Sequence, residues 1–368
     1  RILYMFHRFK TRGGKFLFSK YDFASLDFDR AIENLITCLP ANPHLKEFDL
    51  RQYDFDALVV NGEGSFIFAT PPWRESVVEA MEIYWAKKLG KKVFFMNSML
   101  SDDPFSKHNQ KTIDCMQKIF NACDAVCVRE YKSLTYINKY YPTVKAKYFP
   151  DALFTWYHLI NDEHQILNGK YYIPHSSERD EAYFQFDFSE PYVCISGSSA
   201  IIGACKGDLS VAVKAYSNLV KKVKCNLKMN VFLVNVCEGD EFLNKVSIYT
   251  NTPIIPLDMP LIAAAKILAN ARVYISGRYH PAIMASLGGT PCVFMGSNSH
   301  KTSAVQELLN YDDVVEYKLL PAEQDCDDII KDAKKKIGQL GLREKIQKRA
   351  YELSTQAEEM IKVLEDVQ

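Results

Sequence analysis

Residues 273–287 read Val-Tyr-Ile-Ser-Gly-Arg-Tyr-His-Pro-Ala-Ile-Met-Ala-Ser-Leu. The apolar run at the start predicts a buried strand, and the proline at position 281 suits the first turn of a helix that follows directly. A strand that leads into a helix in this way is half of a βαβ unit, which belongs to a parallel sheet. Such sheets bind ligands beyond the carboxyl ends of their strands, so residues 276–281 are the first candidate site.

Two side chains with useful chemistry lie in this turn. Arg278 and His280 are two residues apart at the strand exit, so both can project into the same crevice. An arginine offers a planar fork for carboxylate or phosphate, a histidine carries a proton near neutral pH, and a helix N-terminus favours an anion. The alternative is a surface ion pair and a capping histidine. Because position and residue types agree, we favour an anion-binding site that transfers protons.

The same alternation of buried strand and amphipathic helix extends along most of the chain. Strands are predicted at residues 58–60, 93–96, 125–128, 146–149, 192–196, 231–235, 273–275 and 292–295, and residues 2–6 are a candidate opening strand. Helices are predicted at residues 74–89, 112–120, 133–141, 210–223, 261–269 and 280–287, and through most of the chain after 325. The pattern predicts an α/β fold of two Rossmann-like domains that face each other across a cleft.

A polar and aromatic stretch separates the two arrays. We therefore expect an N-terminal Rossmann-like domain at residues 1–160, an interdomain connection at 161–190, a C-terminal Rossmann-like domain at 191–345 and a final helix at 346–368. In the charged C-terminal region, apolar residues recur at positions 330, 337, 340, 346, 353 and 361. This stripe predicts surface helices packed on the body of the protein, and a peripheral membrane contact is the alternative.

Polar residues also follow the other predicted strands. A glycine-rich turn, Asn61-Gly62-Glu63-Gly64, comes after the strand at 58–60 and could bring backbone amides close to a ligand. Residues in the same position at other strands, or in the turns just beyond them, are Arg129, Asp151, Ser196, Ser198, Ser299 and Lys301. Each of these is alternatively a helix cap, an ion-pair partner or a plain strand exit.

Composition narrows the class of protein. The 368 residues carry 45 Lys and Arg against 45 Asp and Glu, so the chain lacks the basic excess that a broad nucleic-acid footprint needs. No apolar run is long enough to predict a transmembrane helix. The ten cysteines are scattered and form no CxxC pair, which favours reduced thiols in a cytoplasmic protein over structural zinc. No metal ion is expected.

Four segments, in this order, resemble the polysaccharide pyruvyl transferase family. They are Asp56-Ala-Leu-Val-Val-Asn-Gly-Glu-Gly-Ser65, Asp124-Ala-Val-Cys-Val-Arg-Glu-Tyr-Lys-Ser133, Phe149-Pro-Asp-Ala-Leu-Phe154 and the segment from Ser276 to Pro291, which runs on to His300 and Lys301. Individually each match is moderate, but their order and spacing make the set fairly specific. The resemblance covers roughly residues 25 to 310.

The resemblance implies a fold like that of the two-domain glycosyltransferases called GT-B, with the last helix crossing back to the first domain. It implies transfer of pyruvate from phosphoenolpyruvate to two hydroxyls of one sugar, which forms a ketal and releases phosphate. Arg278 is then expected to hold the donor and His280 to act as acid and base, without any further cofactor. The remaining candidates would divide between the donor, with Lys301 and the serines, and the acceptor, a glycan or lipid-linked sugar. The cytoplasm or the membrane surface is the expected location.

Two alternatives remain at this level. A glycosyltransferase of the same architecture would use Arg278 and Lys301 to bind the diphosphate of a nucleotide sugar, and would need a carboxylate on the ribose. Glu238 and Asp240 follow the strand at 231–235 but are not diagnostic. A catalytically silent sugar-binding subunit is the non-enzyme alternative. We expect Arg278→Ala and His280→Ala to abolish turnover and to leave the fold intact.

Overall fold

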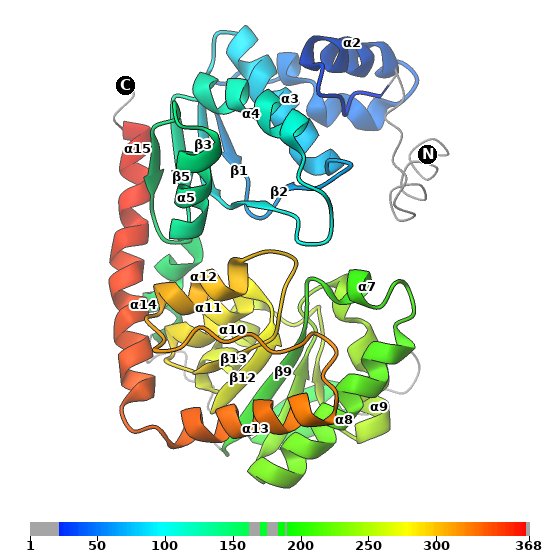
Figure 1. The fold of residues 1–368 in the computed structure, drawn as a ribbon, viewed down its shortest axis with the longest axis vertical. Coiled ribbons are helices and arrows are strands. Elements are labelled where there is room, and N and C mark those ends of the chain that lie inside the picture. Colours follow the sequence, from blue (N-terminus) through cyan, green and yellow to red (C-terminus); the bar gives the residue numbers. More distant parts are fainter. Residues whose placement is uncertain (1–21, 162–169, 175–182, 188–189, 366–368) are drawn as a thin grey trace. The chain divides into compact units, whose positions relative to one another are not determined.

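The computed structural model describes residues 22–161, 170–174, 183–187 and 190–365. They form two compact units (Figure 1). Unit 1 contains the chain up to Asp151 together with Glu359–Gln368, and unit 2 contains Ala152–Glu358. Residues 152–160, which we expected in the first domain, therefore belong to unit 2. The expected final segment at 346–368 is divided in the same way, because only its last ten residues belong to unit 1.

The sheet of unit 1 is parallel and its strands follow one another in sequence order. The strands are β1 (Ala57–Asn61), β3 (Lys92–Ser98), β5 (Ala125–Val128) and β6 (Ala146–Tyr148), in the order β1-β3-β5-β6. They are connected through α3 (Arg74–Lys88), α4 (Gln110–Ala122) and α5 (Tyr131–Tyr140). Because right-handed crossovers that all step in one direction leave their helices on one face, these helices share a single core with that face.

The opposite face of this sheet is covered by the end of the chain. Val93 and Phe95 of β3 point into the helix-covered core, and the alternating residues Phe94 and Met96 point the other way. They pack against Met360 and its neighbours in η6 (Glu359–Ile361) and α15 (Lys362–Glu365). The C-terminal segment thus completes the core of unit 1.

Smaller elements fill out unit 1. A parallel pair is formed by β2 (Phe66–Phe68) and β4 (Leu100–Asp102). Near the start of the described chain lie α2 (Phe28–Cys38), η1 (Pro43–Phe48) and η2 (Leu50–Gln52). The Asp27 carboxylate accepts a hydrogen bond from the Arg30 amide and so caps α2, a helix that sequence reasoning missed. The candidate strand at residues 2–6 lies outside the described residues.

Unit 2 contains a five-stranded parallel sheet with a reversal in its strand order. The strands are β9 (Tyr192–Ser198), β10 (Asn230–Val234), β11 (Ile254–Ile255), β12 (Val273–Gly277) and β13 (Cys292–Phe294), in the order β11-β10-β9-β12-β13. The first strand is central, the next two lie on one side of it and the last two on the other. This order is that of a Rossmann sheet, and the crevice between β9 and β12 is its switch point. The predicted α/β fold of Rossmann-like sheets is confirmed.

Helices surround this sheet and extend beyond it. Those between or directly after the strands are α7 (Ile201–Ala204), α8 (Ser210–Leu227), α9 (Phe242–Thr250), α10 (Leu261–Asn270), α11 (Tyr279–Leu287) and α12 (Lys301–Leu308). The later helices are α13 (Glu323–Gly338) and α14 (Leu342–Glu358). Of the apolar stripe predicted along them, Ile330, Ile346 and Leu353 are buried, whereas Leu340 is fully exposed. The buried members favour packing within unit 2 as the role of the stripe.

The stretch expected as an irregular connection contains a hairpin. Between η3 (Ala152–Trp156) with α6 (Tyr157–Asn161) and the start of β9, the strands β7 (Lys170–Pro174) and β8 (Tyr183–Asp187) pair antiparallel. Sequence reasoning predicted neither strand, because the segment lacks the apolar runs of the parallel strands.

Candidate functional site

Arg278 and His280 lie at the switch point of unit 2. β9 and β12 pair in parallel, and a shift in register between Ile275 and Gly277 places Gly277 opposite Ser198. Arg278 is the residue that precedes α11, and His280 lies half-buried in the first turn of that helix. The structure therefore brings both residues to the carboxyl edge of the sheet, next to a helix N-terminus, which is the position that sequence analysis predicted.

Arg278 is held by a buried carboxylate from a neighbouring loop. Its Nη2 donates a hydrogen bond of 2.6 Å to Oδ1 of Asp240, a residue of the short helical turn η5 (Glu238–Asp240) that follows β10. The Asp240 side chain is fully buried, and the Arg278 side chain is 12% exposed. The Arg278 Nε atom is buried without a hydrogen-bond partner. The guanidinium is thus fixed at one nitrogen and incompletely satisfied at another.

The ion pair changes what removal of Arg278 would do. Burial raises the pKa of the Asp240 carboxyl, and the neighbouring Arg278 charge opposes that rise. Without the guanidinium, a fully buried carboxylate would lose its charged partner, which destabilises a fold strongly. The buried ion pair argues against our expectation that Arg278→Ala leaves the fold intact, and Arg278→Lys is the better probe.

Ser196 lies too deep in the sheet to reach a ligand. It is fully buried in β9, and its hydroxyl is hydrogen-bonded to the hydroxyls of Tyr274 and, at 2.6 Å, of Ser276. The Ser276 hydroxyl in turn accepts a bond of 2.9 Å from the Arg278 amide. The direct donor contact predicted for Ser196 is corrected accordingly: its hydroxyl belongs to a buried chain that fixes the backbone at Arg278.

The other predicted donor residues are Ser198, at the end of β9, and Ser299 and Lys301, which follow β13. The Ser198 hydroxyl donates to the Gly296 carbonyl at 2.6 Å, so it ties the two strand exits together. Ser299 is half-buried in that loop, and its carbonyl accepts a bond of 2.9 Å from the Ser297 hydroxyl. Lys301 is the half-buried first residue of α12. Ser299 and Lys301 thus remain near the carboxyl edge, whereas Ser198 is engaged by backbone.

Unit 1 has a second buried arginine at the corresponding edge of its own sheet. Arg129 follows β5 and its side chain is fully buried. Its Nη1 lies 3.0 Å from Oδ2 of Asp151, which follows β6, and 3.4 Å from Oε1 of Glu63, which follows β1. Asp151 is buried and Glu63 is 47% exposed. Three predicted residues from three strand exits therefore meet in one ion-pair cluster.

The glycine-rich turn after β1 packs tightly against β3. A Cβ on Gly62 would lie 2.5 Å from the Ser98 Oγ and 2.9 Å from the Phe95 ring, so only glycine fits there. The Gly62 amide donates to the Ser98 Oγ at 3.0 Å. Asn61 is exposed, and the Gly64 amide donates to the Glu63 carboxylate at 2.6 Å. Close packing against β3, rather than approach to a ligand, explains the first glycine.

Sequence reasoning missed a protonatable carboxyl beside this turn. Burial raises the pKa of Glu79 on α3 to about 7, although a hydrogen bond from the Ser65 hydroxyl opposes the rise. The charges of nearby acidic side chains, Glu63 among them, contribute in the same direction as burial. Burial also raises the pKa of Glu82, on the same helix, to about 7. In the sequence, both residues fit the solvent-exposed face of an amphipathic helix.

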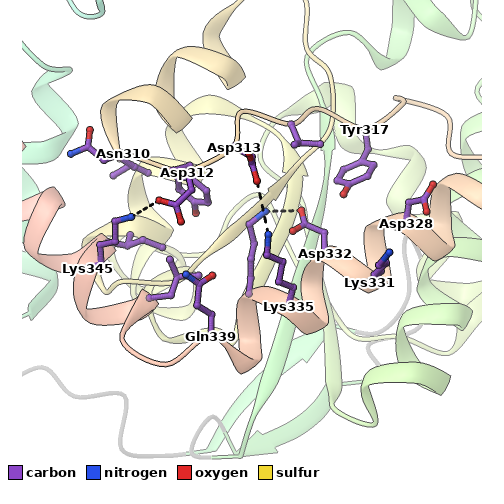
Figure 2. Close-up of a pocket in the computed structure, with 16 residues that line it drawn as sticks. Asn310, Asp312, Asp313, Tyr317, Asp328, Lys331, Asp332, Lys335, Gln339 and Lys345 are labelled. Carbon is purple, nitrogen blue, oxygen red and sulfur yellow. Dashed lines mark hydrogen bonds and ion pairs between the residues drawn. The ribbon is translucent and has the colours of Figure 1, made fainter.

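A separate cavity of about 550 Å³ lies in unit 2, between α13, the start of α14 and the loop after α12 (Figure 2). Four lysines and four aspartates line it, and three pairs of them lie at 2.6–4.0 Å. Arg278 and His280 are not among its lining residues. Its four lysines are matched by four aspartates, so the lining has no excess of positive charge to attract an anion.

Two further findings apply to residues 22–161, 170–174, 183–187 and 190–365. Within them, no three or more His, Cys, Asp and Glu side chains are grouped so that they could bind a metal ion. No described helix combines the length and apolarity needed to span a membrane.

Comparisons with known proteins identify one family. The family model described as polysaccharide pyruvyl transferase matches residues 4–299. No curated protein sequence matches the chain. Among solved structures, the chain is similar to MurG of Acinetobacter baumannii, with 11% identity over 92% of this chain and 79% of that one and a TM-score of 0.43. It is also similar to HepE of Anabaena in complex with UDP and glucose, with 11% identity over 90% and 81% and a TM-score of 0.43.

Proposed function

The chain belongs to the polysaccharide pyruvyl transferase family, an enzyme family, and we propose that it transfers pyruvate from phosphoenolpyruvate to two hydroxyls of one sugar in a glycan or its precursor. The proposal rests on the observation that Arg278 and His280 both lie at the switch point of unit 2. Phosphoenolpyruvate has a carboxylate and a phosphate close together, so its site needs a hydrogen-bond fork for anions. Arg278 supplies that fork, and Lys301 adds a second cation near the same edge.

We assign proton transfer to His280. The methylene carbon of the donor gains a proton and becomes a methyl group, and a sugar hydroxyl bonds to the neighbouring carbon. A second hydroxyl of the same sugar bonds to that carbon as phosphate leaves, which gives the ketal. Of the two hydroxyl protons, one balances the methyl group and the other leaves with phosphate. An imidazole ring can give the first proton and accept one from a hydroxyl.

The acceptor side is assigned to unit 1. The Arg129 cluster presents the half-exposed Glu63 carboxylate beside the turn after β1, and Asn61 is exposed in the same turn. Carboxylate and amide groups can hydrogen-bond to sugar hydroxyls. We also propose a cytoplasmic location, since all ten cysteines are free thiols, in line with a reducing compartment.

One observation weighs against a nucleotide-sugar donor. Such a donor needs a carboxylate for the ribose, and the candidates were Glu238 and Asp240. Asp240 is fully buried and already pairs with Arg278, so it is not available to a ribose. Glu238 is exposed and remains the single candidate of the two.

Thermal unfolding in the presence of donors tests the proposal without knowledge of the acceptor. The wild-type protein is heated with phosphoenolpyruvate and, separately, with UDP-, GDP- and CMP-sugars. A ligand at about 100 times its Kd stabilises the folded state by about 2.7 kcal/mol, which is a shift of a few degrees for a chain of this size. Stabilisation by phosphoenolpyruvate is expected. Stabilisation by a nucleotide sugar instead would overturn pyruvyl transfer.

A further inference from the structure

We propose that Asp240 is a positioning residue, which holds the Arg278 guanidinium in the orientation that receives the anionic donor. The inference rests on the proposed function for the identity of that donor, phosphoenolpyruvate. It assigns to Asp240 no contact with the donor itself. Its effect on the reaction would pass entirely through Arg278.

The carboxylate is anchored on both of its oxygens. Oδ1 accepts the bond from Arg278 Nη2 at 2.6 Å, and Oδ2 accepts a weaker bond from the Val236 amide at 3.3 Å. The Asp240 amide donates to the Cys237 carbonyl at 2.9 Å, which closes the η5 turn. A fully buried side chain with this set of bonds cannot change its orientation readily, so it is a rigid support for the guanidinium.

The sequence leaves room for this support on the central strand. Asp240 follows β10 and Arg278 follows β12, and β9 lies between these two strands. A Cβ on Gly197, near the end of β9, would lie 2.1 Å from the Asp240 Oδ1 and 3.1 Å from its Cγ. Any larger residue at position 197 would displace the carboxylate. The pair therefore spans the exit of β9 only because that exit is a glycine.

The geometry of Arg278 shows what the support is for. Its amide is fixed by the Ser276 hydroxyl at 2.9 Å, and its Nη2 by Asp240. Its Nε remains buried without a hydrogen-bond partner, and the side chain is 12% exposed. Because the carboxylate cancels the arginine charge, Asp240 reduces the Coulomb attraction for an anion. What it can add is the orientation of the guanidinium N–H groups that would bind phosphoenolpyruvate.

Loss of the Asp240 charge and loss of its positioning role would change the affinity for phosphoenolpyruvate in opposite directions. The direction of the change in Kd therefore distinguishes the two roles. Asp240→Asn removes the negative charge and keeps the size of the side chain. If Asp240 acted only through its charge, the variant would bind phosphoenolpyruvate more tightly. If it positions Arg278, the variant binds phosphoenolpyruvate more weakly despite the extra positive charge, by about tenfold or more. Donor affinity is measured by isothermal titration with phosphoenolpyruvate alone.

A matched control and a second variant keep the test decisive. Glu241→Gln removes an exposed carboxylate that directly follows the same turn, and it should leave the Kd unchanged. Gly197→Ala changes no charge but displaces the Asp240 carboxylate, and it should weaken binding as Asp240→Asn does. Urea unfolding of each variant reports whether it is folded. Gly197→Ala serves as the probe if Asp240→Asn does not fold.

The outcomes separate the inference from the proposed function. Weaker binding of phosphoenolpyruvate in Asp240→Asn and Gly197→Ala, with Glu241→Gln unaffected, supports both. Unchanged or tighter binding in both variants overturns the positioning role and leaves the donor assignment in place. If wild type binds a nucleotide sugar instead, and the variants weaken that binding, the positioning role stands and pyruvyl transfer fails. Absence of any donor binding by wild type overturns both.

Discussion

The two buried arginines, Arg129 in unit 1 and Arg278 in unit 2, are a natural comparison. Both follow a strand at the carboxyl edge of a parallel sheet, and both pair with a buried aspartate. Arg129 is fully buried and faces two carboxylates, whereas Arg278 faces one and is 12% exposed. An arginine enclosed by two acidic partners belongs to the framework of its unit. An arginine held by one acidic partner, with part of its side chain open to solvent, is the better anion receptor.

The largest effect is expected from removal of the enclosed arginine. Arg129→Met should lower the free energy of unfolding by about 3–5 kcal/mol, because it leaves Asp151 buried without its charged partner. Urea unfolding at neutral pH measures this change. The double variant Arg129→Met/Asp151→Leu should recover most of the loss. A loss below about 1 kcal/mol in the single variant would contradict a framework role.

Arg278→Lys should separate binding from folding at the other arginine. A lysine can still pair with Asp240, so stability should change little, but it cannot offer a planar fork to the donor. We expect the affinity for phosphoenolpyruvate to fall by at least about tenfold, as measured by titration calorimetry. Arg272→Lys, at an exposed position just before β12, is the matched control. Equal affinities of wild type and Arg278→Lys for phosphoenolpyruvate would contradict the role of Arg278 as an anion receptor.

The two raised carboxyl pKa values on α3 predict a pH dependence specific to unit 1. Between about pH 4.5 and 7 the unfolded state loses the protons of Glu79 and Glu82 before the folded state does, so stability falls as pH rises through this window. Glu79→Gln and Glu82→Gln should each stabilise the protein at pH 8, by on the order of 1–2 kcal/mol, with little effect at pH 4.5. Urea unfolding at both pH values measures this.

Glu33→Gln, at an exposed position of α2, serves as the control for those two variants. It should not reproduce their pH-dependent gain. If Glu79→Gln and Glu82→Gln gave the same change at pH 4.5 as at pH 8, the two carboxyls would not titrate as described.

The smallest effect is expected deep in the sheet of unit 2. Ser196→Ala removes one link from the hydroxyl chain that connects Tyr274 to Ser276. We expect a loss of about 1 kcal/mol in stability and no change in the Kd of phosphoenolpyruvate. Parallel unfolding and titration experiments distinguish the two. A clear loss of donor affinity at unchanged stability would restore Ser196 to the binding site.

The sequence predicted the parallel strands well because buried strands of this kind are continuous apolar runs. The run Val273-Tyr-Ile275 gave the position of β12, and the following proline gave that of α11. The short parallel strands β2, β4 and β11 were missed, and so were the antiparallel strands β7 and β8, whose composition is mixed. Local pattern thus predicts elements that are long and buried, and fails for those that depend on a neighbouring strand.

Site residues could likewise be predicted from the sequence only where the signal lies in adjacent residues. Arg278 was found because its position after a strand and its chemistry can both be read from adjacent residues. The partnership of Arg278 with Asp240 could not be found in this way, since 38 positions separate them along the chain and the pairing depends on the strand order β10-β9-β12. Ser196 was misassigned for a related reason. The sequence does not distinguish a hydroxyl at the very end of a strand from one that lies two residues earlier, inside the sheet.

The return of the chain to unit 1 has a consequence for biosynthesis. Residues 359–365 supply the side chains that cover one face of the first sheet, yet they are synthesised after all of unit 2. On the ribosome, Phe94 and Met96 must therefore wait for more than 250 further residues before Met360 reaches them. Until then unit 1 has an uncovered apolar surface, whereas unit 2 is encoded by one continuous stretch and needs no later segment. The order of translation thus favours completion of the second unit before the first.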